Sequence, residues 1–255
     1  MATYKKRGYK PKNKSEEQQV ENMDSTTAEV FNTLDETASK SEQWIEKNSK
    51  VLFGSLVVIV VVFLGYLGYN KYIVEPNELD ASNELAFPRK YFDEAATAGS
   101  GIDSLLNLGL EGADGRYGFT DIAEKFSGTD AGNLANYYAG VSYLQLKKYD
   151  KAIEYLSKFD SDDEMLGPVS LGAIGDAFAD IDQQEDALEY YEKAANKKAN
   201  EFTTPLFLYK AGQTAMLIKN YSKAEEMFTK IKENYSKSEQ GRDVEKFINA
   251  AKYAQ

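Results

Sequence analysis

The sequence predicts an all-α protein in which a single N-terminal transmembrane helix is followed by a solenoid of helical hairpins. Three observations lead to this fold class. Residues 51–69 form an uncharged apolar run, three segments after residue 130 repeat at steps of 35 and 37 residues, and the other long segments space their apolar residues as helices do. Spacing of this kind is the main signal for helices, and repeats of this length are typical of solenoids. No segment predicts a sheet.

The composition excludes several classes of catalytic and metal-binding site. The chain has 255 residues, a formal net charge of −11, no cysteine and no histidine. It therefore cannot form a thiolate zinc site, a Ser-His-Asp triad, a cysteine nucleophile or a disulfide. Residues 1–50 hold nine basic and nine acidic side chains, so the whole negative excess lies after residue 69. Because such a surface repels phosphate backbones, we expect no nucleic-acid partner.

The run Val51–Tyr69 is predicted to cross a membrane, within a segment assigned to residues 51–70. Its 19 residues, at ~1.5 Å per residue, give a helix of ~28 Å, which matches a hydrocarbon core of ~30 Å. Thirteen of these residues are Val, Ile, Leu or Phe. Their summed insertion free energy is roughly −4 to −8 kcal/mol. About fifty residues precede the run, so we expect a permanent anchor and not a cleaved signal peptide.

Basic residues set the expected orientation, because Lys and Arg flanking a span stay on the cytosolic side. Nine of them precede the run within residues 1–50, which read as a basic tail (1–14) and a weakly amphipathic helix (16–48). We therefore expect a cytosolic amino end. The tail either contacts anionic lipid or ribosomal RNA, or is a solvated segment that only fixes topology, and we favour the second interpretation.

Residues 71–130 are predicted to hold a helical linker region and a degenerate first hairpin. Residues 78–98 have helical spacing, and Pro88 either starts a new helix there or kinks one. Residues 99–118 contain six glycines and are predicted to form a loop. The segment TDIAEKF, from Thr120, is then the second helix of the hairpin.

Residues 131–237 contain three repeats, and residues 238–255 are predicted to cap them. In each repeat a glycine is followed twelve residues later by an alanine and four residues further by a large side chain. These residues are Gly140, Ala152 and Leu156, then Gly175, Ala187 and Tyr191, then Gly212, Ala224 and Phe228. Small residues let two antiparallel helices approach closely, and we expect the large residue to fill the space between successive pairs.

These repeats resemble the 34-residue tetratricopeptide repeat in spacing and residue types. The family's tryptophan position holds Asn136, Leu171 and Leu208, and Ala215 stands where an aromatic residue is common. A generic array of helical hairpins is the alternative.

Carboxylates are the only abundant acid–base groups. The densest run, Asp160 to Glu164, has no EF-hand spacing and is better explained as a solvated turn. The glycines of residues 99–118 form neither a GxGxxG motif nor a P-loop. We therefore expect no metal, no cofactor, no small-molecule substrate and no enzymatic activity.

A concave surface remains as the candidate site. The first helix of each hairpin in such a solenoid faces inward and lines a groove, which suits an extended peptide or an exposed segment of a partner. The candidate groove residues are Tyr137, Val141, Gln145, Asp176, Asp180, Tyr209, Gln213 and Met216. Alternatively, half of them are simply solvated or covered by the carboxy-terminal helix.

The order of a span, the segment YNKYIVEPNELDASNELAFPRKYFDEA and the segment from Tyr117 to Leu156 resembles the YfgM-like ancillary subunits of the bacterial SecYEG translocon. The likeness covers roughly residues 45–255, although the chain departs from the family in its longer amino end and its glycine-rich 99–118 insertion. The resemblance implies an inner-membrane protein whose periplasmic repeats meet emerging chains or a periplasmic chaperone beside the channel.

Three hypotheses follow. The first is a non-enzymatic, membrane-tethered adaptor of the Sec translocon, since tethering raises the effective concentration of weak contacts. The second is a scaffold or regulator of cell-envelope assembly or division. The third, from a different class, is a carboxylate-dependent hydrolase acting on envelope polymers, and we expect no such activity.

Overall fold

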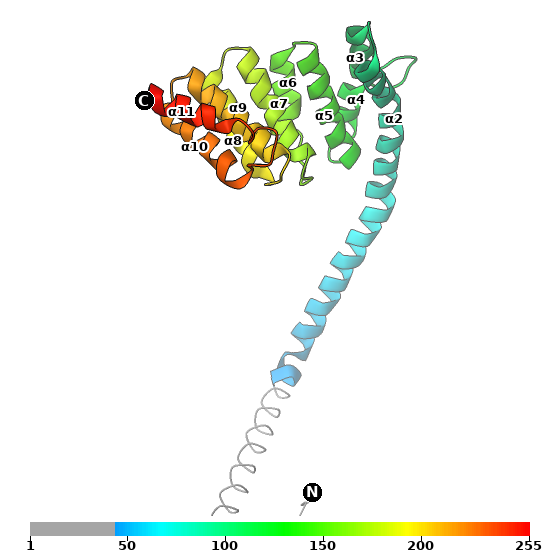
Figure 1. The fold of residues 1–255 in the computed structure, drawn as a ribbon. Coiled ribbons are helices and arrows are strands. Elements are labelled where there is room, and N and C mark those ends of the chain that lie inside the picture. The colour runs from blue at the N-terminus through cyan, green and yellow to red at the C-terminus, as the bar shows by residue number, and fades with distance from the viewer. Residues whose placement is uncertain (1–43) are drawn as a thin grey trace, which may run out of the picture. The chain divides into compact units, whose positions relative to one another are not determined.

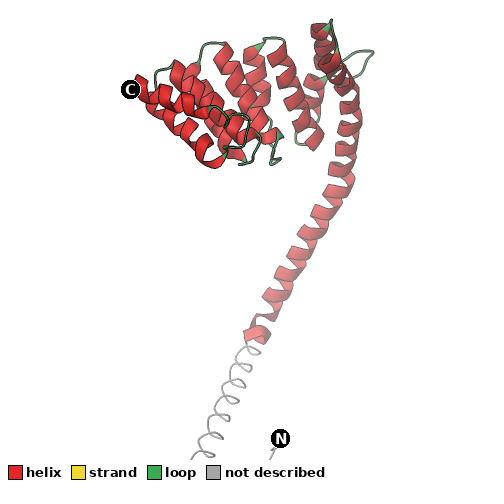
Figure 2. Cartoon of the chain, viewed as in Figure 1, coloured by secondary structure: helices red, strands yellow, loops and turns green. Residues whose placement is uncertain are grey.

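The computed structural model describes residues 44–255, which are helical apart from short turns and loops (Figures 1 and 2). This part of the chain contains no strand, so the all-α prediction is confirmed. The chain divides into two compact units, Met1–Tyr69 and Asn70–Gln255. The predicted basic tail (1–14) and most of the weakly amphipathic helix (16–48) lie outside the described residues.

The described part of the first unit is a helix that carries the predicted span. Within the helix Trp44–Thr97, the most apolar window has a mean hydropathy of 2.6, and none of it is buried inside the protein. Valine, leucine and phenylalanine side chains cover this window, and each would cost free energy in water. The helix therefore has the length, composition and exposed apolar surface that a single membrane span requires.

The second unit begins with a π-helical turn, η1 (Asn70–Val74), followed by α2 (Glu75–Thr97). Pro76 lies in the first turn of α2. It has no N–H to donate to the carbonyl four residues earlier, and its ring crowds that carbonyl, which accounts for the wider turn before it. Pro88 lies inside α2 and is buried, so it does not start a new helix.

The prediction of a loop over residues 99–118 is wrong, because Ile102–Glu111 form the helix α3. Gly101 and Gly112 mark its two ends with φ values of +74° and +79°, which favour glycine. Gly109 lies inside the helix, where a Cβ would stand 3.3 Å from the carbonyl oxygen of Pro88. The glycines thus end a helix and allow it to pack closely on α2. A short helix, α4 (Phe119–Lys125), follows.

Three helical hairpins and a final helix make up the rest of the chain, and they follow one another in order in Figure 1. The helices are α5 (Asp130–Gln145), α6 (Tyr149–Leu156), α7 (Leu166–Asp180), α8 (Gln184–Lys197), α9 (Thr203–Leu217), α10 (Tyr221–Asn234) and α11 (Val244–Ala254). The three repeats of the sequence correspond to the pairs α5/α6, α7/α8 and α9/α10. The predicted solenoid of helical hairpins is confirmed.

Each repeat glycine faces the large side chain of its own hairpin. A Cβ at Gly140 would stand 2.5 Å from Leu156. The corresponding distances are 2.7 Å from Gly175 to Tyr191 and 2.6 Å from Gly212 to Phe228. Each large side chain thus packs onto the glycine of its own pair. It also contacts the next pair, as expected: Leu156 clusters with Ile174 of the second hairpin, and Phe228 stacks on Phe247 of α11.

The turn inside each hairpin is also repeated. Lys147, Asp182 and Lys219 adopt left-handed backbone conformations with φ values of 58°, 63° and 61°. The next residue in each turn donates its N–H to a carbonyl five residues earlier, at 2.8, 2.9 and 2.8 Å. This pattern is the Schellman end of a helix. The repeat register therefore holds for the backbone as well as the side chains.

A carboxylate from α2 caps the first helix of the repeats. The side chain of Glu78 accepts hydrogen bonds from the backbone N–H groups of Asp130, at 2.7 Å, and Ala131, at 3.0 Å. The first turn of a helix has unsatisfied N–H groups and attracts negative charge. Glu78 therefore joins α2 to α5 by a contact between residues more than fifty positions apart.

Removing this cap should loosen the start of α5. We expect Glu78→Ala to cost ~0.5–2 kcal/mol, as other helix caps do, and to speed exchange of the Asp130 and Ala131 amides by about 2- to 30-fold. Hydrogen exchange on the full chain measures this. Glu75→Ala, which removes an exposed carboxylate from the same helix, is the matched control. Equal exchange in the two variants would contradict the capping role.

Candidate partner-binding groove

A cavity of about 650 Å³ lies where the second and third hairpins meet α11. Five helices contribute to its wall, and α9 contributes most. The lining residues are Ala179, Gln184, Tyr191, Lys210, Gln213, Thr214, Met216, Leu217, Phe228 and Phe247. Most of them are apolar, aromatic or amide side chains, and Leu217 is 71% exposed. This composition suits an extended segment that offers both apolar side chains and backbone amides.

Asp176 and Lys210 form a charge pair at the wall of this cavity. The Lys210 Nζ lies 2.6 and 2.8 Å from the two carboxylate oxygens of Asp176. The Tyr191 hydroxyl donates to the same carboxylate at 2.6 Å. Burial raises the pKa of Tyr191 above its ordinary value, and the hydrogen bond to Asp176 raises it further. Tyr191 therefore stays protonated as a donor, and the only charged group lining the cavity is neutralised.

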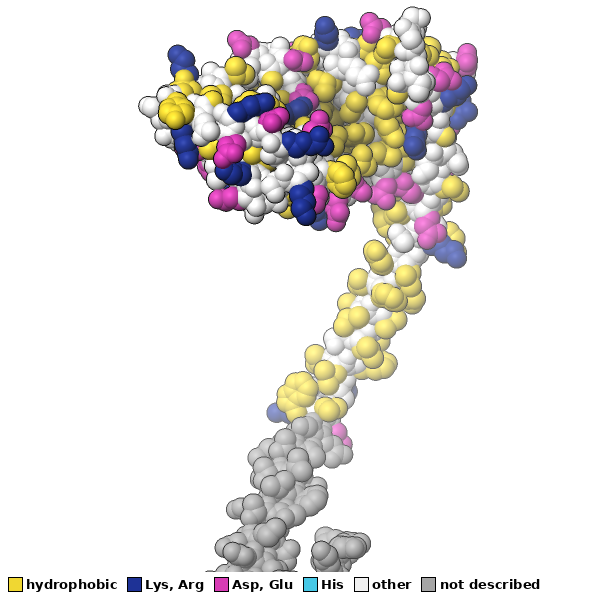
Figure 3. All heavy atoms as spheres, viewed as in Figure 1, with side chains coloured by type: hydrophobic (Ala, Val, Ile, Leu, Met, Phe, Trp, Pro, Cys, Tyr) yellow, Lys and Arg dark blue, Asp and Glu magenta, His cyan; other side chains and the backbone are white. Residues whose placement is uncertain are grey.

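The three predicted groove residues of α5 do not line this cavity. Tyr137 packs against Phe159, with ring centroids 5.2 Å apart. Val141 packs against a buried cluster centred on Leu156 and Ile174. Gln145 is exposed at the end of α5. In Figure 3, hydrophobic side chains gather over α5 and the neighbouring part of α7, whereas charged side chains are interspersed towards α8–α11.

Two of the predicted residues on α7 and α9, Asp180 and Tyr209, are not among the residues that line the cavity. Asp180 is exposed at the end of α7. Asp180 forms a hydrogen bond with Tyr149 of α6. The pKa of Tyr149 is raised mainly by burial and further by this hydrogen bond. Tyr209 packs between Phe228 and Phe247, with ring centroids 5.9 and 5.2 Å away.

The structure brings together Gln213 and Met216 directly, and Asp176 through its ion pair with Lys210. The prediction omitted eight of the lining residues, among them Lys210, Leu217 and Phe247. Lys210 and Leu217 lie three residues before and four residues after Gln213, so the helical face through Gln213 would have found both. As a binding site, the predicted set stays a prediction.

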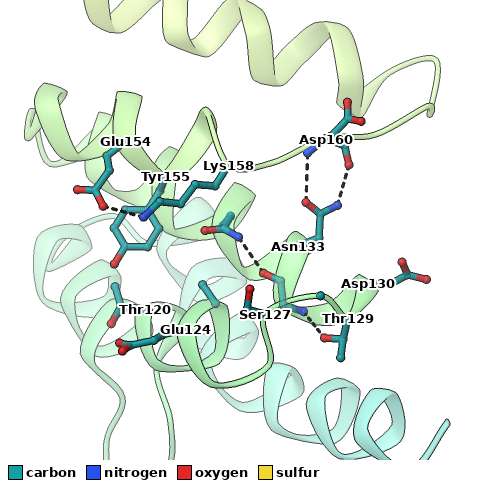
Figure 4. Close-up of a pocket in the computed structure, with 14 residues that line it drawn as sticks. Thr120, Glu124, Ser127, Thr129, Asp130, Asn133, Glu154, Tyr155, Lys158 and Asp160 are labelled. Carbon is teal, nitrogen blue, oxygen red and sulfur yellow. Dashed lines mark hydrogen bonds and ion pairs between the residues drawn. The ribbon is translucent and has the colours of Figure 1, made fainter. Parts of the chain in front are cut away.

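A second hollow of about 740 Å³ lies between α4, the start of α5 and the end of α6 (Figure 4). It is polar: four carboxylates and one lysine line it, and Lys158 is paired with Glu154 at 2.7 Å. Asn133 exchanges two hydrogen bonds with the backbone of Asp160 across its rim, at 2.7 and 3.1 Å. These bonds tie α5 to the loop after α6.

Acid catalysis finds no support in these carboxylates. A glycosidase needs one carboxyl group with a raised pKa beside a second one. Within residues 44–255, the carboxylates whose pKa clearly departs from its ordinary value are Asp160, Asp163, Glu226 and Glu245, and all four are lowered. The main cause in each case is a hydrogen bond that the carboxylate accepts. The donors are Lys197 for Asp160, the Leu166 amide for Asp163, Lys230 for Glu226 and Lys232 for Glu245. The same part of the chain contains no group of three or more carboxylates placed to hold a metal ion.

The fold is an array of helical hairpins with a largely apolar groove where the second and third hairpins meet α11. Comparison with known families agrees: the tetratricopeptide repeat model matches residues 134–162 and 207–238. These segments cover most of the first and third hairpins, and the second shares their glycine contact and turn. These two segments thus match the tetratricopeptide repeat, a helical repeat whose arrays offer extended binding surfaces to other proteins. No curated protein matches the sequence significantly.

Proposed function

We propose that this chain is a membrane-tethered docking protein that holds extended segments of partner proteins in the groove between α7, α9 and α11. The groove carries the proposal. Its wall is apolar and its one lining charge is neutralised by Asp176, so it favours uncharged, extended chain over a folded, charged surface. Gln184 and Gln213 offer amide donors and acceptors to such a backbone.

The membrane anchor makes weak contacts in the groove more effective. A single span confines the groove to the membrane surface, and confinement raises the effective concentration of a nearby partner. Weak and short-lived contacts then become sufficient, which suits a protein that receives a chain and passes it on.

The partner we propose is the Sec translocon, with the repeats on the periplasmic face of the bacterial inner membrane and the amino end in the cytosol. There the groove meets emerging client chains or a periplasmic chaperone at the channel exit. The resemblance to YfgM-like subunits and the nine basic residues on the short side of the span support this assignment.

Site-specific photo-crosslinking in living cells tests the proposal. A photoreactive residue at Gln213, which lines the groove and is exposed, should crosslink to translocon subunits or to chains in transit. The same residue at Ser222, exposed on α10 outside the cavity, is the control. Equal patterns from both positions would contradict groove binding. Crosslinks from Gln213 to envelope-assembly or division proteins alone would keep the groove but overturn the translocon assignment.

A further inference from the structure

The turns that join successive hairpins form a second apolar surface, away from the groove. We call it the turn-edge surface and define it by Glu164, Met165, Asn200, Glu201, Phe202 and Tyr235. These residues line a hollow of about 540 Å³ together with Ala199. An acidic residue followed by a large apolar one occurs twice, as Glu164-Met165 and Glu201-Phe202, 37 residues apart. The surface therefore follows the repeat itself.

Its two large apolar side chains project into solvent from rigid turns. Met165 is 47% exposed and Phe202 is 75% exposed. The Asp163 carboxylate accepts hydrogen bonds from the amides of Met165 and Leu166, both at 2.8 Å. The Asn200 side chain accepts in the same way from Phe202, at 2.9 Å, and from Thr203, at 2.7 Å. Each apolar residue is thus held by an Asx turn at the start of a helix.

The two turns are also joined to each other. The Asn200 side-chain amide donates to the backbone carbonyl of Glu164 at 2.9 Å. Its backbone N–H donates to the Thr204 hydroxyl, which is buried, at 3.0 Å. A surface fixed in this way loses little conformational entropy when a partner binds.

The charge of the surface is negative and uncompensated. Glu164 and Glu201 are exposed, and among the described residues neither forms an ion pair. The lysines nearest in sequence are engaged elsewhere: Lys197 pairs with Asp160 at 2.8 Å, and Lys198 with Asp162 at 3.5 Å. A partner that buries Met165 and Phe202 must therefore approach two free carboxylates.

We propose that the turn-edge surface docks a basic, amphipathic segment of a partner protein, whose apolar side chains pack on Met165 and Phe202 while its Lys or Arg side chains meet Glu164 and Glu201. Charge selects this occupant. Anionic lipid head groups are repelled by the two carboxylates. A second copy of the unit is disfavoured as well, because residues 70–255 hold 32 acidic and 21 basic side chains.

Binding of a synthetic peptide tests this. The probe is a short fluorescent peptide in which leucine and lysine are spaced as on one face of a helix, added to the full chain in nanodiscs of uncharged lipid, with empty nanodiscs subtracted. Anisotropy should report binding that weakens as salt is raised. Phe202→Ser should weaken it at least about tenfold. Glu164→Gln with Glu201→Gln should weaken it about two- to fivefold and flatten the salt dependence.

Matched variants separate this surface from the rest of the molecule. Tyr253→Ser removes an aromatic side chain that is 92% exposed elsewhere, and Glu233→Gln removes an exposed carboxylate. Neither should change the affinity, and Gln213→Arg in the groove should not change it either. The proposal is overturned if a peptide with glutamate in place of lysine binds equally, or if Phe202→Ser binds like Tyr253→Ser. If either of these results is found, the proposal stays overturned even where Phe202→Ser binds anionic vesicles, or associates with itself, more strongly than the unchanged chain does.

Discussion

Replacing Gly172 with valine should destabilise the repeats by about 1–3 kcal/mol or more, because the new side chain has no room. Gly172 lies in α7, and a Cβ there would stand 1.9 Å from Cε1 of Phe207 in α9. Phe207 is 4% exposed, so its ring cannot turn out to solvent without opening the core. Since the contact joins the second and third hairpins, the damage should spread to both.

Thermal unfolding of the full chain in detergent, followed by circular dichroism, measures this effect. The loss corresponds to a fall in Tm of roughly 2 to 12 °C. Gly99→Val is the matched control, because nothing lies within 4 Å of a Cβ at Gly99 and its backbone does not require glycine. A Tm for Gly172→Val within experimental error of the control would show that α7 and α9 do not pack as described.

A single cysteine at Ser222 should react with a membrane-impermeant maleimide in intact spheroplasts, whereas one at Ala2 should not. The natural chain has no cysteine, so each variant carries one thiol and the labelling is all or none. Ser222 is exposed on α10, so its thiol would be accessible once the repeats are outside. Ala2 lies outside the described residues. The expected pattern follows from the apolar run 51–69 and the basic residues before it.

Permeabilised cells supply the control, since both thiols should then react equally. The reverse pattern in intact spheroplasts would place the repeats in the cytosol and contradict the periplasmic role. Labelling of both positions without permeabilisation would show that the apolar helix does not separate them across a membrane.

Local pattern predicted most of the fold. The span follows from one uncharged run, and the three hairpins follow from glycine, alanine and large residues at fixed spacing, because these distances are set by helix geometry. The helix α3 was missed for a physical reason. Gly101 and Gly112 cap the helix, and Gly109 allows a close contact with α2. In the sequence, glycines with these roles cannot be told apart from the glycines of a loop.

The groove was predictable only in part, because helical spacing gives the face of a helix but not what packs on it. Gln213 and Met216 lie at the cavity as their register suggests. Tyr137 and Tyr209 lie at matching positions of the first and third repeats, yet each packs against neighbouring aromatic rings and does not line the cavity. Phe247 reaches the cavity from α11, a contact that depends on how the last helix folds back and that no local spacing shows.

The carboxylate of Glu78 joins α2 to α5 by hydrogen bonds, in addition to the covalent path through α3 and α4. The same two helices also meet through an apolar contact, because the Phe92 ring of α2 lies edge-on to the Tyr138 ring of α5 with 5.0 Å between their centroids. Tension applied to α2 would therefore load both contacts together. If the hydrogen bonds of Glu78 opened, the packed rings would still hold the repeats to α2.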